Sequence, residues 1–239
     1  MYQLILIRHG QSAWNRDNRF TGWADVALTD VGEAQMLKAG RLLRQEGWQV
    51  DLAYTSMLSR CIRSLWALLQ GMDRVWVPVT LDWRLNERHY GALTAMLKDQ
   101  AIETYGADQV LRWRRSYEAK PPPYQDGAAG PVLIDGRYEG VPVTALPSSE
   151  SLQQTSVRVR DIWEESISWS LRAGRRVLVM AHGNSLRALI KQIEGISDTA
   201  IMQVEVPNGV PWVYALDSNL QPLSRQILDT LSGPASEIL

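Results

Sequence analysis

Two short phrases in this chain combine residue types that suit the transfer of an anionic group. Arg8-His9-Gly10 follows the apolar run Leu4–Ile7, and His182-Gly183-Asn184 follows the apolar run Val177–Val179. A neutral imidazole is a competent nucleophile near neutral pH, and a guanidinium offers a planar fork for phosphate oxygens. Gly10 lets the backbone approach a ligand closely. The first phrase therefore predicts a nucleophile, His9, beside a cation, Arg8, that binds an anion.

The second phrase strengthens this interpretation. Of the three histidines in the chain, two follow strand-like runs in the same way. One such histidine could equally be a structural residue bonded to a backbone carbonyl. Two parallel strands placed side by side would bring His9 and His182 together at the sheet edge where open α/β folds build their sites. The backbone N–H groups of Gly183 and Asn184 at a helix start would favour an anion, and a protonated His182 would stabilise a transferring phosphoryl group.

Short polar side chains and a second arginine could complete this site. Ser12 and Asn15 add hydrogen-bond donors to the loop that follows the first strand. Arg60 comes soon after the strand-like run Leu52–Tyr54, which again places a cation near a strand end. An exposed helical arginine is the ordinary alternative for Arg60.

Glu87 is the one carboxylate in the polar stretch Trp83–Gly91. The like charge of a neighbouring phosphate would favour its protonated form, which suits proton donation. A salt bridge to Arg84 or Arg88 explains the same carboxylate equally well. The sequence alone leaves both interpretations open.

Three further cations lie on predicted helices. Arg114 and Arg115 are adjacent, so their side chains point about 100° apart and reach one ligand only near a helix end. A solvated basic face is the alternative for this pair and for Lys98 on the preceding helix.

The composition excludes several classes of protein. With 239 residues, 45% of them hydrophobic, the chain can bury a sizeable core. A net charge of −1 gives no reason to expect nucleic acid or an anionic membrane as a partner. No Cys/His cluster predicts a metal, no apolar stretch reaches membrane-spanning length, and the single cysteine, Cys61, is expected to be a buried, inert thiol. The chain starts with a strand and shows no signal-peptide pattern, which predicts a cytoplasmic protein.

Strand-like and helix-like segments alternate along the chain. This alternation predicts one α/β domain over residues 1–239, a three-layer α/β/α sandwich with a mostly parallel central sheet. Strands are expected at 4–7, 52–54, 75–79, 177–180 and 212–216, and helices at 30–47, 61–69, 95–105, 108–117, 151–171 and 184–194. Residues 119–147, rich in Pro and Gly, could be a linker, but we expect a lid-like excursion from the same domain. Residues 232–239 are expected to be a flexible tail.

Several motifs in order resemble the cofactor-dependent phosphoglycerate mutases of the histidine phosphatase superfamily. The resemblance covers Tyr2 to about Asp217. It includes Arg8-His9-Gly10-Gln11-Ser12 through Trp14-Asn15, Asn18-Arg19-Phe20-Thr21-Gly22-Trp23, Asn86-Glu87-Arg88-His89-Tyr90-Gly91, Trp113-Arg114-Arg115-Ser116-Tyr117, Pro121-Pro122-Pro123, Glu150-Ser151-Leu152 and Ala181-His182-Gly183-Asn184-Ser185-Leu186-Arg187. Three places depart from the family. Ala95-Met96-Leu97-Lys98 stands where members usually read Gly-Leu-Asn-Lys, the tail is short, and the excursion from Tyr124 to Leu146 is unusual in detail.

The resemblance implies a role for each matched residue. His9 would carry the phosphoryl group, Glu87 would give and take the proton of the substrate hydroxyl, and His182 would stabilise the group in transfer. Residues implied to bind the substrate are Arg8, Ser12, Asn15, Thr21, Gly22, Arg60, Tyr90, Lys98, Arg114, Arg115, Gly183 and Asn184.

The activity implied is the interconversion of 3-phosphoglycerate and 2-phosphoglycerate in glycolysis and gluconeogenesis. It would proceed through phosphohistidine and 2,3-bisphosphoglycerate, with a trace of the bisphosphate as primer, no metal, and a homodimer or homotetramer as the expected assembly. A histidine phosphatase acting on small phosphorylated metabolites is the main alternative, because water could take the phosphoryl group from His9. Bisphosphoglycerate synthesis fits less well with Ser12 and Thr21-Gly22, and a catalytically inactive sensor fits less well with an intact site.

Overall fold

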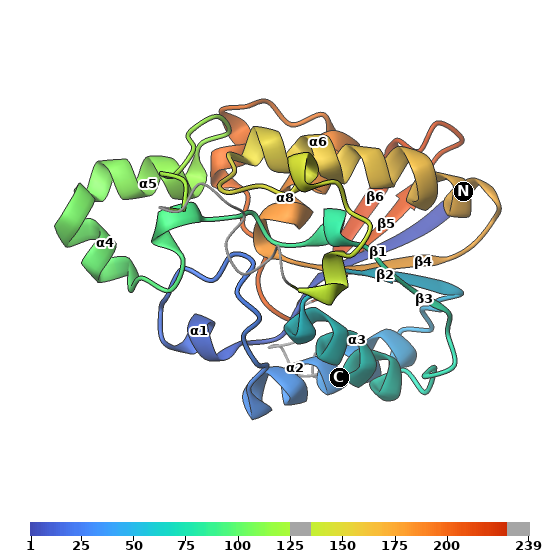
Figure 1. The fold of residues 1–239 in the computed structure, drawn as a ribbon. Helices are drawn as coiled ribbons and strands as arrows, with labels where there is room; N and C mark the ends of the chain where they lie inside the picture. Colours follow the sequence, from blue (N-terminus) through green and yellow to red (C-terminus); the bar gives the residue numbers. More distant parts are fainter. Residues whose placement is uncertain (125–134, 229–239) are drawn as a thin grey trace, which may run out of the picture.

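The computed structural model describes residues 1–124 and 135–228, which build a six-stranded sheet with helices on both faces (Figure 1). The strand order is β3-β2-β4-β1-β5-β6. The β3–β2, β2–β4 and β4–β1 pairs are parallel, whereas the β1–β5 and β5–β6 pairs are antiparallel. The prediction of a three-layer, mostly parallel α/β fold is confirmed. The strands are β1 Tyr2–Arg8, β2 Leu52–Thr55, β3 Val79–Leu81, β4 Val177–Ala181, β5 Trp212–Leu216 and β6 Pro222–Ile227.

Helices α2 and α3 lie on one face of the sheet and α6 and α8 on the other, while α4 and α5 stand at the end toward which β1 runs (Figure 1). The α-helices are α1 Ala13–Arg16, α2 Asp30–Gln45, α3 Ser59–Gly71, α4 Lys98–Tyr105, α5 Ala107–Arg115, α6 Leu152–Ile162, α7 Ser168–Arg172 and α8 Gly183–Glu194. A π-helical turn, Trp163–Ile167, joins α6 to α7. Short 3-10 helices occupy Trp83–Leu85, Gly91–Leu93, Gly136–Tyr138, Val143–Ala145 and Ala200–Gln203.

The central strands are apolar on both faces because helices cover both. Leu4 and Leu6 of β1 pack into the core under α6 and α8, and Ile5 and Ile7 pack into the core over α2 and α3. Side chains of a strand alternate between its faces, so a strand buried on both sides reads as a continuous apolar run. This is why the strands that carry the two histidine phrases were visible in the sequence.

The strand predicted at 75–79 is wrong for most of its length. Only Val79 belongs to β3, and the Val77 N–H bonds back to the Arg74 carbonyl in a turn. Pro78 has no N–H to give to a strand pair, and Trp76 is exposed. Strand β6 was not predicted, because it begins at Pro222 on the sheet edge and lacks an apolar alternation.

The predicted helices are present, with shifted ends. The helix expected at 95–105 begins only at Lys98, because the Ala95 N–H is bonded to the Phe20 carbonyl. The helix expected at 108–117 spans Ala107–Arg115. The long helix expected at 151–171 runs from α6 through the π-helical turn into α7.

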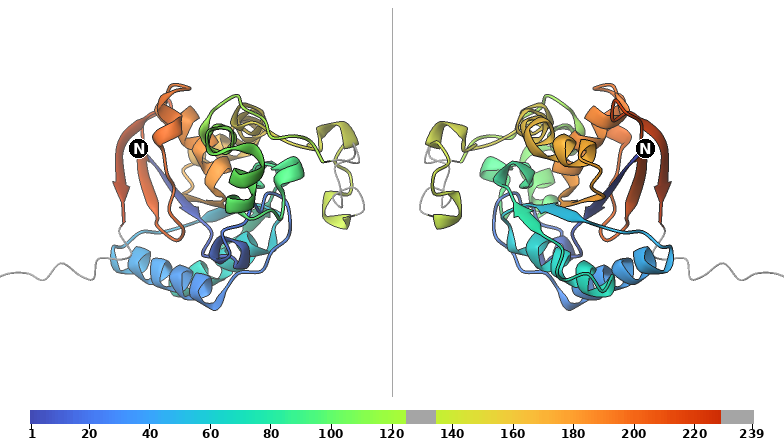
Figure 2. Two further views of the ribbon diagram at one scale, coloured as in Figure 1. Left: turned by 90° about the vertical axis from the view of Figure 1, so that its left-hand side faces the viewer. Right: turned by 90° about the vertical axis from the view of Figure 1, so that its right-hand side faces the viewer.

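The excursion predicted at 119–147 is described only in part, and residues 135–147 stand out from the two helical layers (Figure 2). The tail predicted at 232–239 lies outside the described residues. No helix within 1–124 or 135–228 is long and apolar enough to cross a membrane.

Two glycines allow α2 and α3 to touch backbone to backbone. A Cβ on Gly40 would lie 2.1 Å from the Leu68 carbonyl oxygen, and one on Gly71 would lie 2.4 Å from the Leu37 carbonyl oxygen. The close contact fixes the position of α3, which begins with Ser59-Arg60 at the carboxyl end of β2.

Gly40→Ala is expected to force these helices apart and to lower the free energy of unfolding by about 1–3 kcal/mol, the usual cost of overpacking. Urea denaturation measures the change. Gly136→Ala is the control, because nothing lies within 4 Å of the added methyl group. Equal stabilities of the two variants would contradict the packing argument.

Candidate active site

Strands β1 and β4 bring the two histidines together. Their register pairs Arg8 with Ala181, so both strands end at the same level, and the His9 N–H donates to the Ala181 carbonyl over 3.1 Å. The rings of His9 and His182 then meet edge to face, with 4.9 Å between centroids. The side-by-side placement predicted from the two phrases is therefore what the structure shows.

His9 is held as a neutral imidazole with one defined tautomer. Its Nδ1 lies 2.7 Å from the Gly10 carbonyl oxygen, and since a carbonyl only accepts, Nδ1 carries the proton. Burial, Arg60 and Arg8 together lower the pKa of His9 well below 6.5. The ring therefore keeps an unprotonated Nε2, which is the form that can act as a nucleophile.

His182 is completely buried and contacts one group from the turn between β2 and α3 and one from α3. Its Nε2 lies 2.8 Å from the Ser56 hydroxyl and 3.3 Å from the Cys61 sulfur. Burial and Arg60 lower its pKa well below 6.5. Burial also raises the pKa of the Cys61 thiol to about 12, in keeping with the inert thiol expected from the sequence.

Glycine is needed after His9 for a different reason from the one expected. Gly10 faces α2 rather than a ligand: a Cβ there would lie 2.2 Å from the Gly32 carbonyl oxygen. The Gly10 N–H donates to the Ser64 hydroxyl of α3 over 3.0 Å. Gly10 thus lets the His9 loop lie directly on the helices beneath the sheet.

A cavity of about 310 Å³ opens beside His9. All of the residues predicted for the site line it except Ser12 and His182. Ser12 is buried and caps α1 by accepting a hydrogen bond from the Asn15 N–H, so it shapes the loop. The predicted residues on the wall are Arg8, His9, Asn15, Thr21, Gly22, Arg60, Glu87, Tyr90, Lys98, Arg114, Arg115, Gly183 and Asn184.

Arg60 is a buried cation and not the exposed helical residue that the sequence left open. Only 1% of it is exposed, and its guanidinium donates to the carbonyls of Ala24 and Gly22, each over 2.8 Å. Gly22 has φ +54°, and a Cβ there would press on the Tyr90 N–H at 3.1 Å. Arg8 comes from the end of β1 and donates to the Val206 carbonyl over 3.1 Å.

Glu87 makes no salt bridge to Arg84 or Arg88. Its Oε1 accepts from the Arg88 N–H over 2.8 Å and from the Asn184 N–H over 3.1 Å. Arg84 pairs instead with Asp82 and Glu165. The N-terminus of α8 therefore binds the Glu87 carboxylate itself, and the Asn184 side chain donates to the Tyr90 hydroxyl over 3.0 Å.

Helices α4 and α5 supply a second group of cations. Burial and the positive charges of Arg114 and Arg8, which line the same cavity, lower the pKa of Lys98. Lys98 reaches the cavity although Ala95 and Leu97 depart from the family pattern. The Lys98 N–H bonds to the Asn18 carbonyl, and Ala95 adopts φ +72°, a left-handed conformation that glycine reaches without strain.

Sequence reasoning assigned no role to several cavity residues, namely Arg19, Phe20, Arg187, Val204, Glu205, Val206 and Pro207. Arg187 is buried and donates to the Asn184 side chain over 2.9 Å and to the Arg115 carbonyl over 3.0 Å. It thereby ties the start of α8 to the end of α5. Arg187 lies one helical turn after Asn184, and this spacing in the sequence could have predicted that the two side chains share a face.

Glu205 brings a carboxylate to the cation-rich wall. It forms an ion pair with Arg115, and this hydrogen bond holds the pKa of Glu205 below its usual range. Among the described residues, Glu87 and Glu205 are the only carboxylates on a wall that carries seven cations: Arg8, Arg19, Arg60, Lys98, Arg114, Arg115 and Arg187. Within residues 1–124 and 135–228, no three His, Cys, Asp or Glu side chains form a group that could hold a metal ion.

A model of the histidine phosphatase superfamily, branch 1, matches residues 4–132 and 134–219. The chain belongs to this superfamily. The family part of the sequence-based resemblance is confirmed, and the chain is an enzyme of a phosphoryl-transfer superfamily.

Solved structures of phosphatases share the fold. A mycobacterial glucosyl-3-phosphoglycerate phosphatase in complex with VO3 is 21% identical, with a TM-score of 0.72 and coverage of 95% of this chain and 97% of that one. A putative α-ribazole-5′-phosphate phosphatase from Escherichia coli is 22% identical, with a TM-score of 0.69 and coverage of 95% and 94%. An α-ribazole phosphatase from Shigella flexneri is 21% identical, with a TM-score of 0.64 and coverage of 90% and 91%.

The histidines provide a direct test of the electrostatics. The pKa values of His9 and His182 lie well below 6.5 and that of His89 is about 4, each mainly because of burial. Below pH 6.5 the unfolded chain binds protons that the folded chain does not, so stability falls as the pH falls, by about 1.4 kcal/mol per pH unit for each histidine. NMR titration should find none of the three imidazoles protonating near pH 6.5 in the folded protein and all of them doing so in urea. A folded-state titration at or above pH 6.5 would refute the buried, neutral pair.

Glu205→Gln is expected to strengthen the binding of an organic phosphate, with 3-phosphoglycerate as the probe, because an incoming anion no longer has to displace a carboxylate from Arg115. Glu205 is 69% exposed, so the gain should be modest, about two- to fivefold in Kd by titration calorimetry. Glu103→Gln, on the exposed surface of α4 and away from the cavity wall, is the matched control. Weaker binding in Glu205→Gln would mean that Glu205 orients Arg115 for the ligand.

Proposed function

We propose that this protein interconverts 3-phosphoglycerate and 2-phosphoglycerate through a phosphohistidine at His9. The observation that carries the proposal is that one cavity collects cations from two parts of the fold. Arg8 and Arg60 lie at strand ends beside His9, and Lys98, Arg114 and Arg115 come from α4 and α5. A molecule with a phosphate and a carboxylate needs cations for both, whereas a lone phosphate needs one group.

The catalytic steps follow from the positions of His9 and Glu87. Phosphorylated His9 donates its group to a substrate hydroxyl: the N–P bond breaks, a new P–O bond forms, and the hydroxyl proton passes to Glu87. The resulting 2,3-bisphosphoglycerate reorients and presents its other phosphate to Nε2. That P–O bond breaks as the N–P bond re-forms, and Glu87 returns the proton to the leaving oxygen. Arg8 and Arg60 would stabilise the charge during transfer. His182 was expected to act in its protonated form, but burial keeps it neutral in this structure, so its part here is to contact the His9 ring from the side.

The same mechanism implies 2,3-bisphosphoglycerate as the primer, because an enzyme that loses the intermediate is left unphosphorylated. No step in this scheme calls on a metal ion. A cytoplasmic location and a homodimer or homotetramer remain predictions from the sequence.

Hydrolysis is the second candidate, and the comparisons favour it. The similar solved structures named above are phosphatases, and the same His9, Arg8 and Arg60 would serve a water molecule that attacks phosphohistidine. The substrate would then be a small phosphorylated metabolite. The two reactions differ only in which acceptor takes the phosphoryl group from His9.

The deciding experiment follows 3-phosphoglycerate conversion, coupled to enolase, with and without catalytic 2,3-bisphosphoglycerate, while inorganic phosphate is measured in parallel. Stimulated formation of 2-phosphoglycerate with little phosphate release supports the mutase. Phosphate release without 2-phosphoglycerate supports the hydrolase instead.

Two variants separate the proposed roles. His9→Ala is expected to abolish both mutase turnover and phosphoryl labelling by 2,3-bisphosphoglycerate, because the nucleophile is gone. Glu87→Gln should retain slow labelling of His9 while turnover falls by about 10²–10⁴-fold, the usual contribution of a general acid and base. Radiolabelling and the coupled assay measure the two quantities. Turnover by His9→Ala would show that another residue is the nucleophile.

A further inference from the structure

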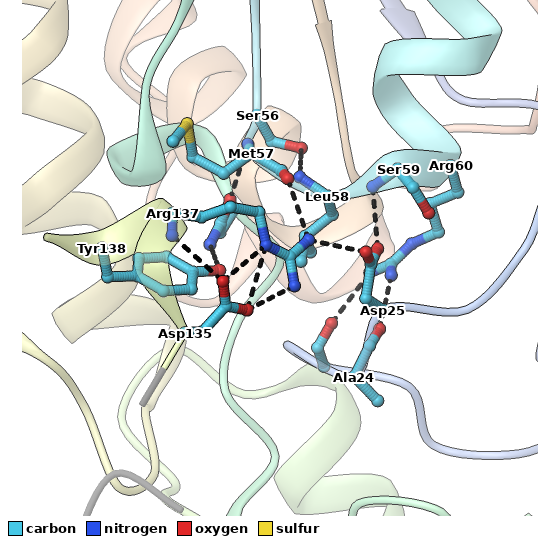
Figure 3. Close-up of polar contacts among 12 residues, drawn as sticks. Ala24, Asp25, Ser56, Met57, Leu58, Ser59, Arg60, Asp135, Arg137 and Tyr138 are labelled. Atoms are coloured by element: carbon cyan, nitrogen blue, oxygen red, sulfur yellow. Dashed lines mark hydrogen bonds and ion pairs between the residues drawn. The ribbon is translucent and has the colours of Figure 1, made fainter. Parts of the chain in front are cut away.

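A turn of the excursion is bonded to the elements that hold Arg60 (Figure 3). Arg137 donates to the Asp25 carboxylate over 2.6 Å and to the Met57 carbonyl over 3.2 Å. Its remaining nitrogens pair with Asp135, whose side chain also caps the Gly136–Tyr138 turn. The guanidinium of Arg137 therefore joins a turn late in the chain to two loops near its start.

Asp25 connects Arg137 to the first turn of α3. The N-cap residue Leu58 offers no side-chain hydrogen bond to this helix, and the Ser59 N–H donates to Asp25 over 2.8 Å instead. Arg60 follows at once and donates to the carbonyls of Ala24 and Gly22, next to Asp25 in the chain. The loop that contains Asp25 and the first turn of α3 therefore fix each other's position. Together they set the direction of the Arg60 side chain.

Tyr138 supports the same loops through a second set of contacts. It is buried, stacks on Trp23 with 5.3 Å between ring centroids, and accepts a hydrogen bond from the Asn86 side chain over 2.8 Å. Asn86 in turn accepts from the Met57 N–H over 3.0 Å. The turn thus packs against the loop of Trp23 and Asp25 and against the β2–α3 turn together.

Both oxygens of the Asp25 carboxylate are occupied, Oδ1 by the Ser59 N–H and Oδ2 by Arg137. Asp25 lies close enough to Arg60 for its charge to raise the pKa of that guanidinium, against the larger opposing effect of burial. In the absence of Arg137, the free carboxylate oxygen would attract the Arg60 guanidinium away from the carbonyls of Ala24 and Gly22. Arg60 would then be both misplaced and partly neutralised toward a phosphate.

We propose that Arg137 is a positioning residue for phosphoryl transfer, which holds Asp25 so that Arg60 stays aimed into the cavity. The described residues of the excursion do not line that cavity, so this role is exerted through Asp25 and Met57. The inference rests on the proposed use of Arg60 to bind the transferring group. It assigns residues 135–138 a part in catalysis without contact to the substrate.

The test measures the single-turnover rate of His9 phosphorylation by 2,3-bisphosphoglycerate and the Kd of inorganic phosphate. Arg137→Ala is expected to slow phosphorylation about tenfold and to weaken phosphate binding by a similar factor, whereas Arg137→Lys, which still pairs with Asp25, recovers most of the loss. Arg84→Ala is the matched control. Arg84 has the same local arrangement, an N-capping Asp82 two residues earlier and a second carboxylate, Glu165, but it does not contact Asp25 or Met57.

A double-mutant cycle distinguishes positioning from general destabilisation. In an Arg60→Lys background, Arg137→Ala should have little further effect on phosphate affinity, because the group that it positions is already changed. An undiminished effect in that background, or equal rates for Arg137→Ala and Arg84→Ala, would overturn the proposal. If the wild-type protein takes no label from 2,3-bisphosphoglycerate, the proposed function fails instead, and the phosphate Kd still tests the role of Arg137.

Discussion

The parallel pairing of β1 with β4 is the constraint on which the site depends. Because of this pairing, two central strands end at the same level. The residue that follows each strand therefore lies at the carboxyl end of the sheet, beside the other. His9 and His182 therefore meet although 172 positions separate them in the chain. The helices on either face exclude water from both rings, and this burial keeps them neutral at the pH where a nucleophilic imidazole is needed.

A second constraint is the mutual repulsion of the cations around the cavity. The protein holds them in place by giving the guanidinium groups fixed acceptors: backbone carbonyls for Arg60, Arg187 and Arg8, and a carboxylate for Arg115. Carbonyl acceptors orient a guanidinium without cancelling its charge, so Arg60 remains available to an anion. A carboxylate partner such as Glu205 does cancel charge, which makes Arg115 the cation whose availability depends most on its surroundings.

The parts of the fold that sequence reasoning found were those with a strong local signal. Continuous apolar runs predicted β1 and β4, and apolar residues at helical spacing predicted α2. Its errors came where tertiary contacts override local preference. The loop before α4 stays non-helical because Ala95 bonds across to Phe20, and β6 exists because β5 offers an edge to pair with.

The sequence by itself determined the chemistry of the site: a nucleophile, a carboxylate, and enough arginines in ordered motifs to identify the superfamily. It also determined that the site lies at strand ends, since glycine and polar residues follow each buried run. Only the tertiary structure decided what each group touches. Glu87 bonds to the start of α8 and not to Arg84, and Gly10 faces α2 and not a ligand. Arg187 reaches from α8 to the end of α5, Glu205 comes to Arg115 from a distant segment, and Arg137 contacts the loop of Asp25. Such contacts depend on how the layers pack, and residues far apart in a chain leave no periodic pattern that predicts them.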